Sequence, residues 1–219
     1  MKKGFTLAEV LITLGIIGVV AALTMPALIS NHRKTVVVTR LQKFYSIINQ
    51  AVKLSEAENG PAEDWNYPVL RDNYQQEKEF YDTYLAKYIL SLKVEECLYT
   101  NLPSLCVHFS DGSIMQMRHL GSGGWDVFFH VNEKELRHFQ DTDITRGTFA
   151  FIFNRKSIAL NNGKHSFFEP YIAGWDGTRS GLIRHATTMQ GCADVGSYCA
   201  ALIRYDGWQI KADYPPGKF

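Results

Sequence analysis

The polar and apolar positions divide the chain into one long apolar segment and a mixed remainder. Val10 to Ile29 contains no charged residue, whereas charges are common from His32 onward. From Phe5 to Ile29 is 25 residues. As a helix this is about 37 Å long, against a bilayer hydrocarbon core of about 30 Å. The pattern therefore predicts a helix that can span a membrane, followed by a soluble ectodomain.

The apolar pattern continues beyond this segment with a helical period. Between Thr35 and Ala57, apolar or small residues recur at spacings of three and four, which predicts an amphipathic helix. Asn59-Gly60-Pro61 is a helix stop, so we expect one helix from about Phe5 to about Glu58. The predicted buried stripe consists of Leu41, Phe44, Tyr45, Ile48, Ala51, Val52 and Ser55.

Pro26 interrupts the apolar half of this helix. It removes the hydrogen bond to the Ala22 carbonyl and predicts a kink there. Gly15, Gly18 and Ala22 form a face of small residues. Such a face permits close contact between helices, but small residues are also frequent in membrane helices in general. Both interpretations stay open.

The pattern after the long helix predicts an α+β fold, in which an antiparallel sheet packs on the amphipathic half of that helix. Residues 74–92 have mixed helical spacing. Asp111-Gly112 and Asp206-Gly207 each separate two short apolar runs, so each predicts a β-hairpin. Asn161 to Cys199 has few clear periods and predicts a long loop region. The strand candidates are 105–109, 114–118, 125–131, 148–153, 200–205 and 208–211.

Composition and net charge change this picture little, whereas the cysteines add to it. With 46% hydrophobic residues and a net charge of +1, the chain can bury a core and has no global field that would recruit nucleic acid. Its four cysteines form an even set that favours disulfides in an exported domain. Loop length favours pairing Cys97 with Cys106 and Cys192 with Cys199, and the other connectivities stay open. A zinc site is the alternative to disulfides, and it is disfavoured because neither cysteine pair has C-x-x-C spacing.

Glu9 is the one charged residue between Phe5 and Ile29. A carboxylate in lipid costs roughly 2.5–3.5 kcal/mol and is tolerated when it is paired or functional. A cut between Gly4 and Phe5 would create a new α-amino group four residues before Glu9. In a bundle of identical helices, Glu9 of one chain could pair with the new amine of a neighbour, which would set the helix register during assembly.

A secretory signal peptide, cleaved after Ala22 or Ala27, is the alternative for this segment. The basic residues Lys2 and Lys3 would suit it. The length of the apolar run, the carboxylate at its beginning and the helical pattern after it argue against a signal peptide.

The stretch Lys3-Gly4-Phe5-Thr6-Leu7-Ala8-Glu9-Val10 resembles the processing motif of type IV pilins and type II secretion pseudopilins. The matching features are a short basic leader, Gly4 before the cut, Phe5 after it, and Glu9 at the fifth mature position. Pro26 falls where that family has its helix-kinking proline. The resemblance implies cleavage after Gly4 by prepilin peptidase, N-methylation of Phe5, and assembly through the N-terminal helix.

The resemblance also implies a pilin-like fold, a location and a set of partners. The chain would be anchored by one pass in the bacterial inner membrane, with its ectodomain outside the cytoplasm, before it enters a pilus or a periplasmic pseudopilus. Its partners would be other copies of itself, related pilin subunits, the peptidase and methyltransferase, and the inner-membrane assembly platform. A loop bounded by Cys192 and Cys199 would shape the filament surface. The expected boundaries are 1–4 for the leader, 5–30 for the transmembrane helix, 31–60 for its amphipathic continuation and 61–219 for the ectodomain.

No stretch of the sequence predicts a catalytic site, a cofactor or a metal. Gly121 to Gly124 lacks the Lys-Ser/Thr of a phosphate loop. Asp176-Gly177-Thr178 lacks the acidic ladder of a calcium loop and is better explained as a turn. The histidines are scattered, without a nucleophile and an acidic partner beside them. The four tryptophans are expected in the core or on the sheet.

Two hypotheses of function follow. The first is a structural subunit of a type IV pilus or a secretion pseudopilus, which is not an enzyme. The second is a membrane-tethered module that uses the same leader, does not polymerise, and presents the Asn161 to Cys199 loops to DNA, sugar or a secreted substrate. The sequence does not distinguish a pilus from a pseudopilus or a DNA-uptake filament.

Overall fold

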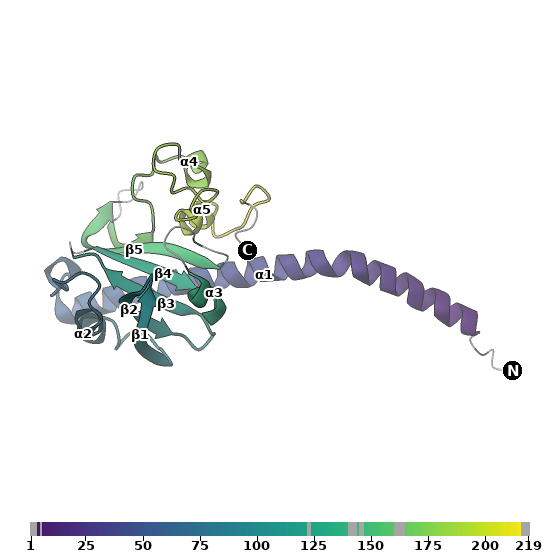
Figure 1. Ribbon diagram of the computed structural model, residues 1–219, viewed down its shortest axis with the longest axis horizontal. Helices are drawn as coiled ribbons and strands as arrows, with labels where there is room; N and C mark the ends of the chain where they lie inside the picture. The colour runs from purple at the N-terminus through teal and green to yellow at the C-terminus, as the bar shows by residue number, and fades with distance from the viewer. Residues whose placement is uncertain are drawn as a thin grey trace. The chain divides into compact units, whose positions relative to one another are not determined.

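The long helix α1 runs from Leu7 to Asn59 in the computed structural model of the chain (Figure 1). It continues through Pro26. It ends where Gly60 takes a left-handed conformation, with φ at +79°, and donates its amide to the Glu56 carbonyl at 3.1 Å. Glycine adopts this conformation without steric cost. The prediction of one long helix is therefore confirmed.

The structure describes Gly4 and residues 6–121, 124–139, 144, 147–159 and 165–215. The chain divides into two units, Met1–Val36 and Val37–Phe219. The first unit contains the apolar half of α1. The second unit, called the head below, contains the rest of α1 and all the other helices and strands.

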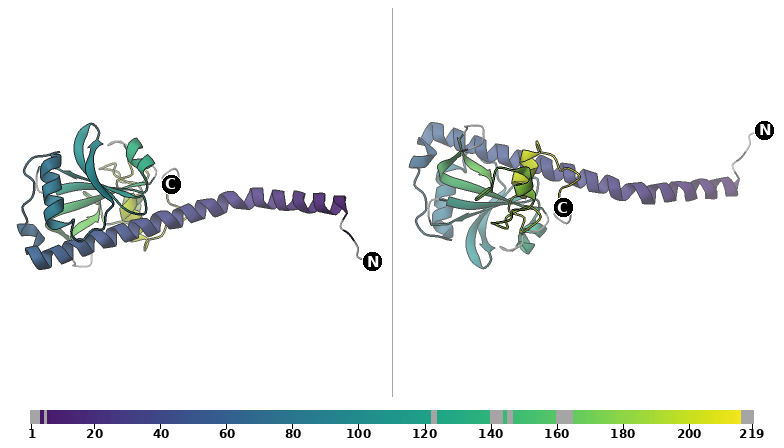
Figure 2. Two further views of the ribbon diagram at one scale, coloured as in Figure 1. Left: turned by 90° about the horizontal axis from the view of Figure 1, so that it is seen from below. Right: turned by 90° about the horizontal axis from the view of Figure 1, so that it is seen from above.

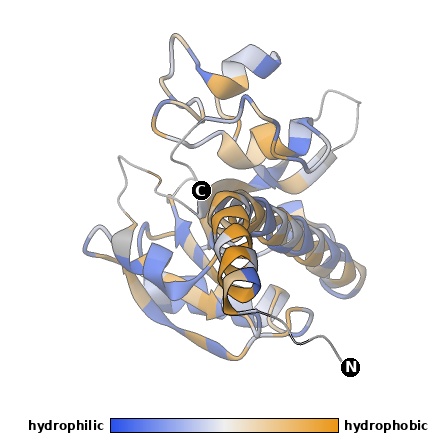
Figure 3. Cartoon of the chain, turned by 90° about the vertical axis from the view of Figure 1, so that its right-hand side faces the viewer, coloured by the Kyte–Doolittle hydropathy of each residue, from blue (hydrophilic) through white to orange (hydrophobic). Residues whose placement is uncertain are grey.

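In the first unit, α1 is apolar on all sides. The mean hydropathy of its most apolar stretch is 2.3, and none of that stretch is buried within the chain. Figure 3 shows this part of the helix almost continuously in the hydrophobic colour. The hydroxyls of Thr13 and Thr24 donate to backbone carbonyls earlier in the helix, both at 2.9 Å, so they need no partner from outside. By length and composition, this half of α1 can cross a membrane.

The head contains a six-stranded antiparallel sheet in which each strand pairs with the next one along the chain (Figure 2). Thr100 and Asn101, at φ 44° and 70°, form the tight turn between the first two strands. The strands are β1 (Lys93–Tyr99), β2 (Leu102–His108), β3 (Ile114–His119), β4 (Gly124–His130), β5 (Thr148–Ala159) and β6 (His165–Pro170). The strands predicted at 105–109, 114–118, 125–131 and 148–153 thus correspond to β2, β3, β4 and β5.

The other helices of the head are short. Asn73, Asn132 and Thr178 cap three of them, because each side chain accepts a hydrogen bond from a backbone amide of the first turn. These helices are the 3-10 turn η1 (Ala62–Asp64), α2 (Tyr74–Tyr84), α3 (Glu133–His138), α4 (Arg179–Ile183) and α5 (Cys199–Tyr205).

The amphipathic part of α1 packs on one face of the sheet (Figure 2). Phe44 lies at the centre of this contact. Its ring stacks on Phe129 with 4.7 Å between centroids, and it makes edge contacts with Phe151 at 5.2 Å and Phe168 at 5.6 Å. The predicted stripe is confirmed, with Tyr45 only partly buried; its fully buried members are Leu41, Phe44, Ile48, Ala51, Val52 and Ser55.

A buried carboxylate joins the C-terminal helix to α1. Glu169 of β6 is fully buried and accepts a hydrogen bond from Tyr45 Oη at 2.9 Å. It also forms an ion pair with Arg204 of α5. The Arg204 guanidinium lies over the Tyr45 ring, 4.7 Å from its centroid. Because a buried charge is stable only when it is paired, these three side chains tie α5 to α1 and to β6.

The C-terminal hairpin predicted around Asp206-Gly207 is wrong. Residues 199–205 form the helix α5, and Gly207, at φ 73°, ends it. The amide of Gly207 donates to the Arg204 carbonyl and that of Trp208 to the Ile203 carbonyl, which is the Schellman pattern of a helix end. A continuous apolar run before Asp-Gly suits a buried helix as well as a strand, and here every residue from Cys199 to Ile203 is buried.

Two other predictions need correction. The helix predicted over 74–92 ends at Tyr84, and β1 begins at Lys93. The region Asn161 to Cys199 is not one long loop, because it contains β6 and α4. In β1, Lys93, Glu95 and Glu96 interrupt the apolar residues, and α3 is mostly charged, so neither gave a clear apolar pattern.

We predict that Phe44→Ala destabilises the head strongly. The substitution leaves a cavity among aromatic rings, so we expect the free energy of unfolding to fall by about 3–5 kcal/mol. Leu54→Ala is the matched control on the same helix, because Leu54 is 55% exposed. Its effect should stay within about 0.5 kcal/mol. Urea titration of the full chain in micelles, followed by near-UV circular dichroism, measures both; equal losses would contradict the packing described.

Glu77 of α2 is a buried carboxylate whose charge depends on pH. Its Oε1 accepts the backbone amide of His119 at 2.7 Å, while Oε2 has no hydrogen-bond partner in the described part of the chain. Burial raises the pKa of Glu77 from 4.5 to about 7. The folded head therefore holds this proton more tightly than the unfolded chain, so its stability falls as the pH rises from about 4.5 to about 7.

Glu77→Gln should remove this pH dependence. The amide keeps an acceptor for His119 and cannot ionise, so near pH 8 the variant should be more stable than the original chain by on the order of 3 kcal/mol. At about pH 4.5 the two should be similar. Thermal unfolding across this pH range measures the difference. Glu79→Gln, at an exposed position of the same helix, should follow the original chain, and a pH slope retained in Glu77→Gln would show that other groups cause it.

Candidate functional site

The residues expected to be processed, Gly4 and Phe5, come just before α1 in the sequence. Gly4 is exposed, while Phe5 lies outside the described residues. Glu9 is in the first turn of the helix. Its Oε2 accepts hydrogen bonds from the Thr6 amide at 2.8 Å and from the Thr6 hydroxyl at 2.7 Å, and the Thr6 hydroxyl accepts the Glu9 amide at 3.3 Å. This reciprocal arrangement is a capping box.

The capping box gives Glu9 a second role beside the pairing expected from the sequence. Thr6-Leu7-Ala8-Glu9 has the Thr-x-x-Glu spacing of this motif, so the capping box could have been predicted from the sequence. The bonds to Thr6 satisfy two lone pairs of the carboxylate but do not cancel its charge. In an apolar environment, a cation would still lower the cost of holding it.

The other predicted assembly residues lie further along the apolar half of α1. Pro26 is inside the helix. At Gly15 and Gly18, an added Cβ atom would meet no other atom within 4 Å. The described residues of one chain therefore leave this face uncovered. The face can be a surface for contact with another helix or ordinary membrane composition, and the structure of a single chain does not favour either interpretation.

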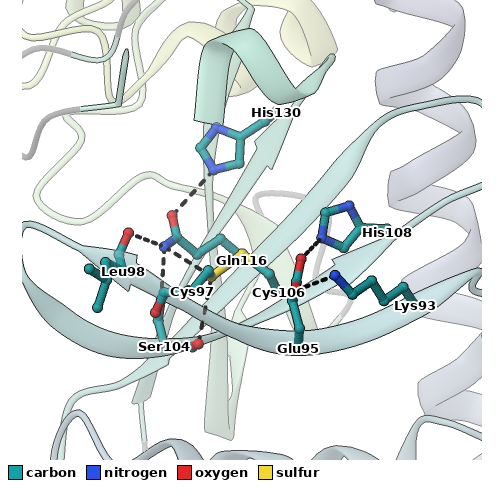
Figure 4. Close-up of a disulfide and its surroundings, with 9 residues drawn as sticks. All are labelled: Lys93, Glu95, Cys97, Leu98, Ser104, Cys106, His108, Gln116 and His130. Carbon is teal, nitrogen blue, oxygen red and sulfur yellow. Dashed lines mark hydrogen bonds and ion pairs between the residues drawn. A yellow bond between two sulfur atoms is a disulfide. The ribbon is translucent and has the colours of Figure 1, made fainter. Parts of the chain in front are cut away.

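The first cysteine pair forms a disulfide in the sheet. Cys97 of β1 and Cys106 of β2 are joined, with 5.8 Å between their Cα atoms (Figure 4). Among the described strands, β1 pairs only with β2, so the bond fixes this edge strand to the rest of the sheet. Glu95 of β1 lies beside it. It forms an ion pair with Lys93, and its Oε1 lies 2.8 Å from Nε2 of His108.

A chain of buried polar groups continues from this disulfide across the sheet (Figure 4). Gln116 donates to the Ser104 hydroxyl at 2.8 Å and to the Leu98 carbonyl at 3.1 Å. Its Oε1 lies 3.3 Å from Nε2 of His130, whose Nδ1 lies 3.0 Å from the Thr148 hydroxyl. Burial lowers the pKa of His130 to about 3, so this imidazole is neutral. The chain of bonds is structural, because each group in it is satisfied.

The second pair, Cys192 and Cys199, is also joined, with 4.5 Å between Cα atoms. It connects the segment before α5 to the first residue of that helix. Both disulfides join neighbours in the sequence, the pairing that loop length favours. In the described part of the chain, no group of three or more His, Cys, Asp or Glu residues could hold a metal.

The loop features considered in the sequence have structural roles. Asp176 accepts the amide and hydroxyl of Thr178 at 2.9 and 2.8 Å, a turn that leads into α4. Of the glycine-rich stretch 121–124, residues 122 and 123 lie outside the described residues. Trp65 and Trp125 are buried in the core, as expected, and Trp175 and Trp208 pack against it.

Comparison with known families agrees with this geometry. A prokaryotic N-terminal methylation motif, the leader of type IV pilins and pseudopilins, matches residues 1–25. Together with a long apolar helix and an antiparallel sheet, it defines a pilin-like processed protein. A family of unknown function, DUF6613, matches residues 27–218, and the chain belongs to that family. No curated protein and no solved structure matches the chain.

We predict that Thr6→Val loosens the first turn of α1. The substitution removes the hydroxyl that both donates to and accepts from Glu9, and loss of a cap costs about 1 kcal/mol. Amide hydrogen exchange in the first turn, measured in lipid nanodiscs, should become about fivefold faster. Thr13→Val is the control, because its hydroxyl bonds only one carbonyl inside the helix. Unchanged exchange near Glu9 in Thr6→Val would refute the capping role.

Proposed function

We propose that this protein is a structural subunit of a bacterial filament, a type IV pilus or a type II secretion pseudopilus. The observation that carries the proposal is the apolar half of α1, exposed on all sides directly after a pilin-type leader. Such a surface is stable in lipid or against other apolar helices. Both environments are what a subunit needs, first in the membrane and then in the filament core.

The proposed course begins in the inner membrane with the head outside the cytoplasm. Prepilin peptidase cleaves after Gly4, and Phe5 becomes the methylated N-terminus. The proposed segments are 1–4 as the leader, 5–30 as the membrane and filament-core helix, 31–60 as its continuation and 61–219 as the ectodomain. The inner-membrane platform then adds the subunit to other copies or related pilins, with Pro26 as the point of helix plasticity.

Glu9 has a specific part in this proposal. In the single chain its carboxylate is bonded to Thr6. In the assembled state, the Phe5 amine of a neighbouring copy would pair with the same carboxylate and neutralise it. An ion pair in apolar surroundings is favourable only with close geometry, so it would select one register between neighbouring helices.

The second candidate is the membrane-tethered binding module. A cavity in the head, described in the next subsection, supports it, because a ligand site does not require polymerisation. Cysteine crosslinking between neighbouring apolar helices in cells separates the candidates. Ladders of crosslinked chains support the filament subunit, and isolated monomers support the tethered module.

We predict that the mature protein begins at Phe5 and carries one added N-methyl group. Mass spectrometry of the N-terminal peptide, from protein purified out of its native host, checks this. Gly4→Leu should leave the leader attached, because the peptidase would meet a large side chain at the cut. A native protein that begins at Met1, or beyond Ala22, would contradict the processing proposed.

We expect Glu9→Ala to insert normally into the membrane and to assemble poorly. Removing the charge makes insertion easier but removes the pairing group. Filament yield should fall at least about tenfold, since the loss of 1.4 kcal/mol at one interface already gives that factor. Asp64→Ala, an exposed acidic position of the head, is the control. Normal yield from Glu9→Ala in membranes that contain the protein would rule out the pairing role.

A further inference from the structure

The face of the sheet opposite α1 has its own small core. Tyr99, Phe128, Ile144 and Ala150 are buried together there, with Phe139 and Tyr171 packed against them. In β4, the residue after Phe128 is Phe129, which points to α1 instead, because successive side chains alternate between faces.

This face contains a cavity of about 330 Å³. That volume is at the lower end of the range of ligand pockets, about 300–1,000 Å³. The cavity is built from β1, β4 and β5 together with the residues after β6 and those before α5. Its lining residues are Tyr99, Asp126, Phe128, Ile144, Ala150, Phe151, Tyr171, Gln190, Val195 and Ser197.

The part of the lining that comes from the C-terminal region is held firmly in place. The amide of Tyr171 donates to the Ala150 carbonyl at 3.0 Å. The Ser197 hydroxyl donates to the side-chain oxygen of Gln190 at 2.5 Å. The Cys192–Cys199 disulfide spans the segment that contains Val195 and Ser197. The cavity is therefore a preformed hollow, which lowers the entropic cost of binding.

Asp126 supplies the strongest acceptor in this cavity. No hydrogen bond reaches its carboxylate from the described residues. Its nearest cation is Arg118, 3.9 Å away, but that guanidinium bonds Asp72 at 2.6 Å and lies over the Tyr99 ring at 4.2 Å. Burial raises the pKa of Asp126, and Arg118 opposes the rise. The carboxylate is thus partly removed from water, and the described residues leave its hydrogen-bonding capacity unused.

These groups select one class of ligand. An anion is disfavoured by Asp126. A cation gains little, because Arg118 already lies beside that carboxylate. A neutral ring with several hydroxyl groups matches best: Asp126 accepts and the Gln190 amide donates. The Ser197 hydroxyl, whose proton goes to Gln190, can accept, and the tyrosine hydroxyls do both. Phe128 and Tyr171 add apolar surface to the lining, against which the carbon atoms of such a ring can pack.

We propose that this cavity binds one neutral sugar unit of a glycan, with Asp126 and Gln190 as its main hydrogen-bonding groups. The inference goes beyond the role as a filament subunit and needs the head alone. A subunit that polymerises and one that does not could both carry the site. In a filament, the same site repeated along the polymer would raise the avidity for a glycan-covered surface.

The test uses the full chain in nanodiscs of phosphatidylethanolamine and phosphatidylglycerol, which contain no sugar headgroups. Saturation-transfer NMR measures binding of the methyl glycosides of glucose, galactose, mannose and N-acetylglucosamine, with choline as the cationic probe. We expect saturable binding of at least one glycoside, with a Kd of about 1 mM. Asp126→Asn and Gln190→Leu should each weaken it about tenfold, the loss expected for one hydrogen bond.

Asp111→Asn is the matched control, because Asp111 lies in a different cavity of the head. It should bind the glycoside as the original chain does, and thermal unfolding should confirm that all variants are folded. Three results would overturn the proposal: no saturable binding of any glycoside, binding that Asp126→Asn and Gln190→Leu leave unchanged, or choline bound in place of the sugars. Because filament assembly is not needed, these results are independent of the assembly experiments above.

Discussion

The contact between Phe44 and the aromatic rings of the sheet is the interaction on which the head depends. One side chain of α1 meets Phe129 of β4, Phe151 of β5 and Phe168 of β6. This contact places the helix across β4, β5 and β6 and determines which face of these strands is covered. The stripe on either side of Phe44 then follows from helical spacing. The opposite face of the sheet must be covered by the chain itself, and the segments after β4 and β6 do so.

The same helix meets two different environments. In the head, α1 buries one stripe and exposes the rest, while in the first unit it exposes apolar side chains on all sides. None of its most apolar stretch is buried by the described residues, so lipid or another chain must cover it. Polar groups at the beginning of the apolar half of α1 would be costly in such apolar surroundings. The capping box formed by Thr6 and Glu9 lowers that cost, because it gives hydrogen bonds to a carboxylate and two backbone amides where the helix begins.

The face of the sheet away from α1 is built differently from the face that α1 covers. The covered face is aromatic and aliphatic, whereas the other contains Gln116, Arg118, Asp126 and His130 among its buried or half-buried groups. Ordered polar networks fix a unique arrangement when every group is satisfied. Here the network from the first disulfide to Thr148 is satisfied. Asp126 lies outside this network and receives no hydrogen bond from the described residues. The cavity proposed to bind a sugar lies on this face, beside the satisfied network, and includes Asp126 in its lining.

The sequence by itself determined the features that depend on local pattern: the leader, the long helix with its buried stripe, the four middle strands, and the pairing of neighbouring cysteines. Each of these is encoded by residues close together in the chain. The tertiary structure decided what local pattern leaves open. Asp206-Gly207 suits a hairpin or a helix end, and burial of residues 199–203 on all sides selected the helix. The cavity joins Tyr99, Asp126, Tyr171 and Gln190, which are far apart in sequence. Only the packing of β1, β4 and the C-terminal segments brings them together, because no periodicity specifies contacts between distant parts of a chain.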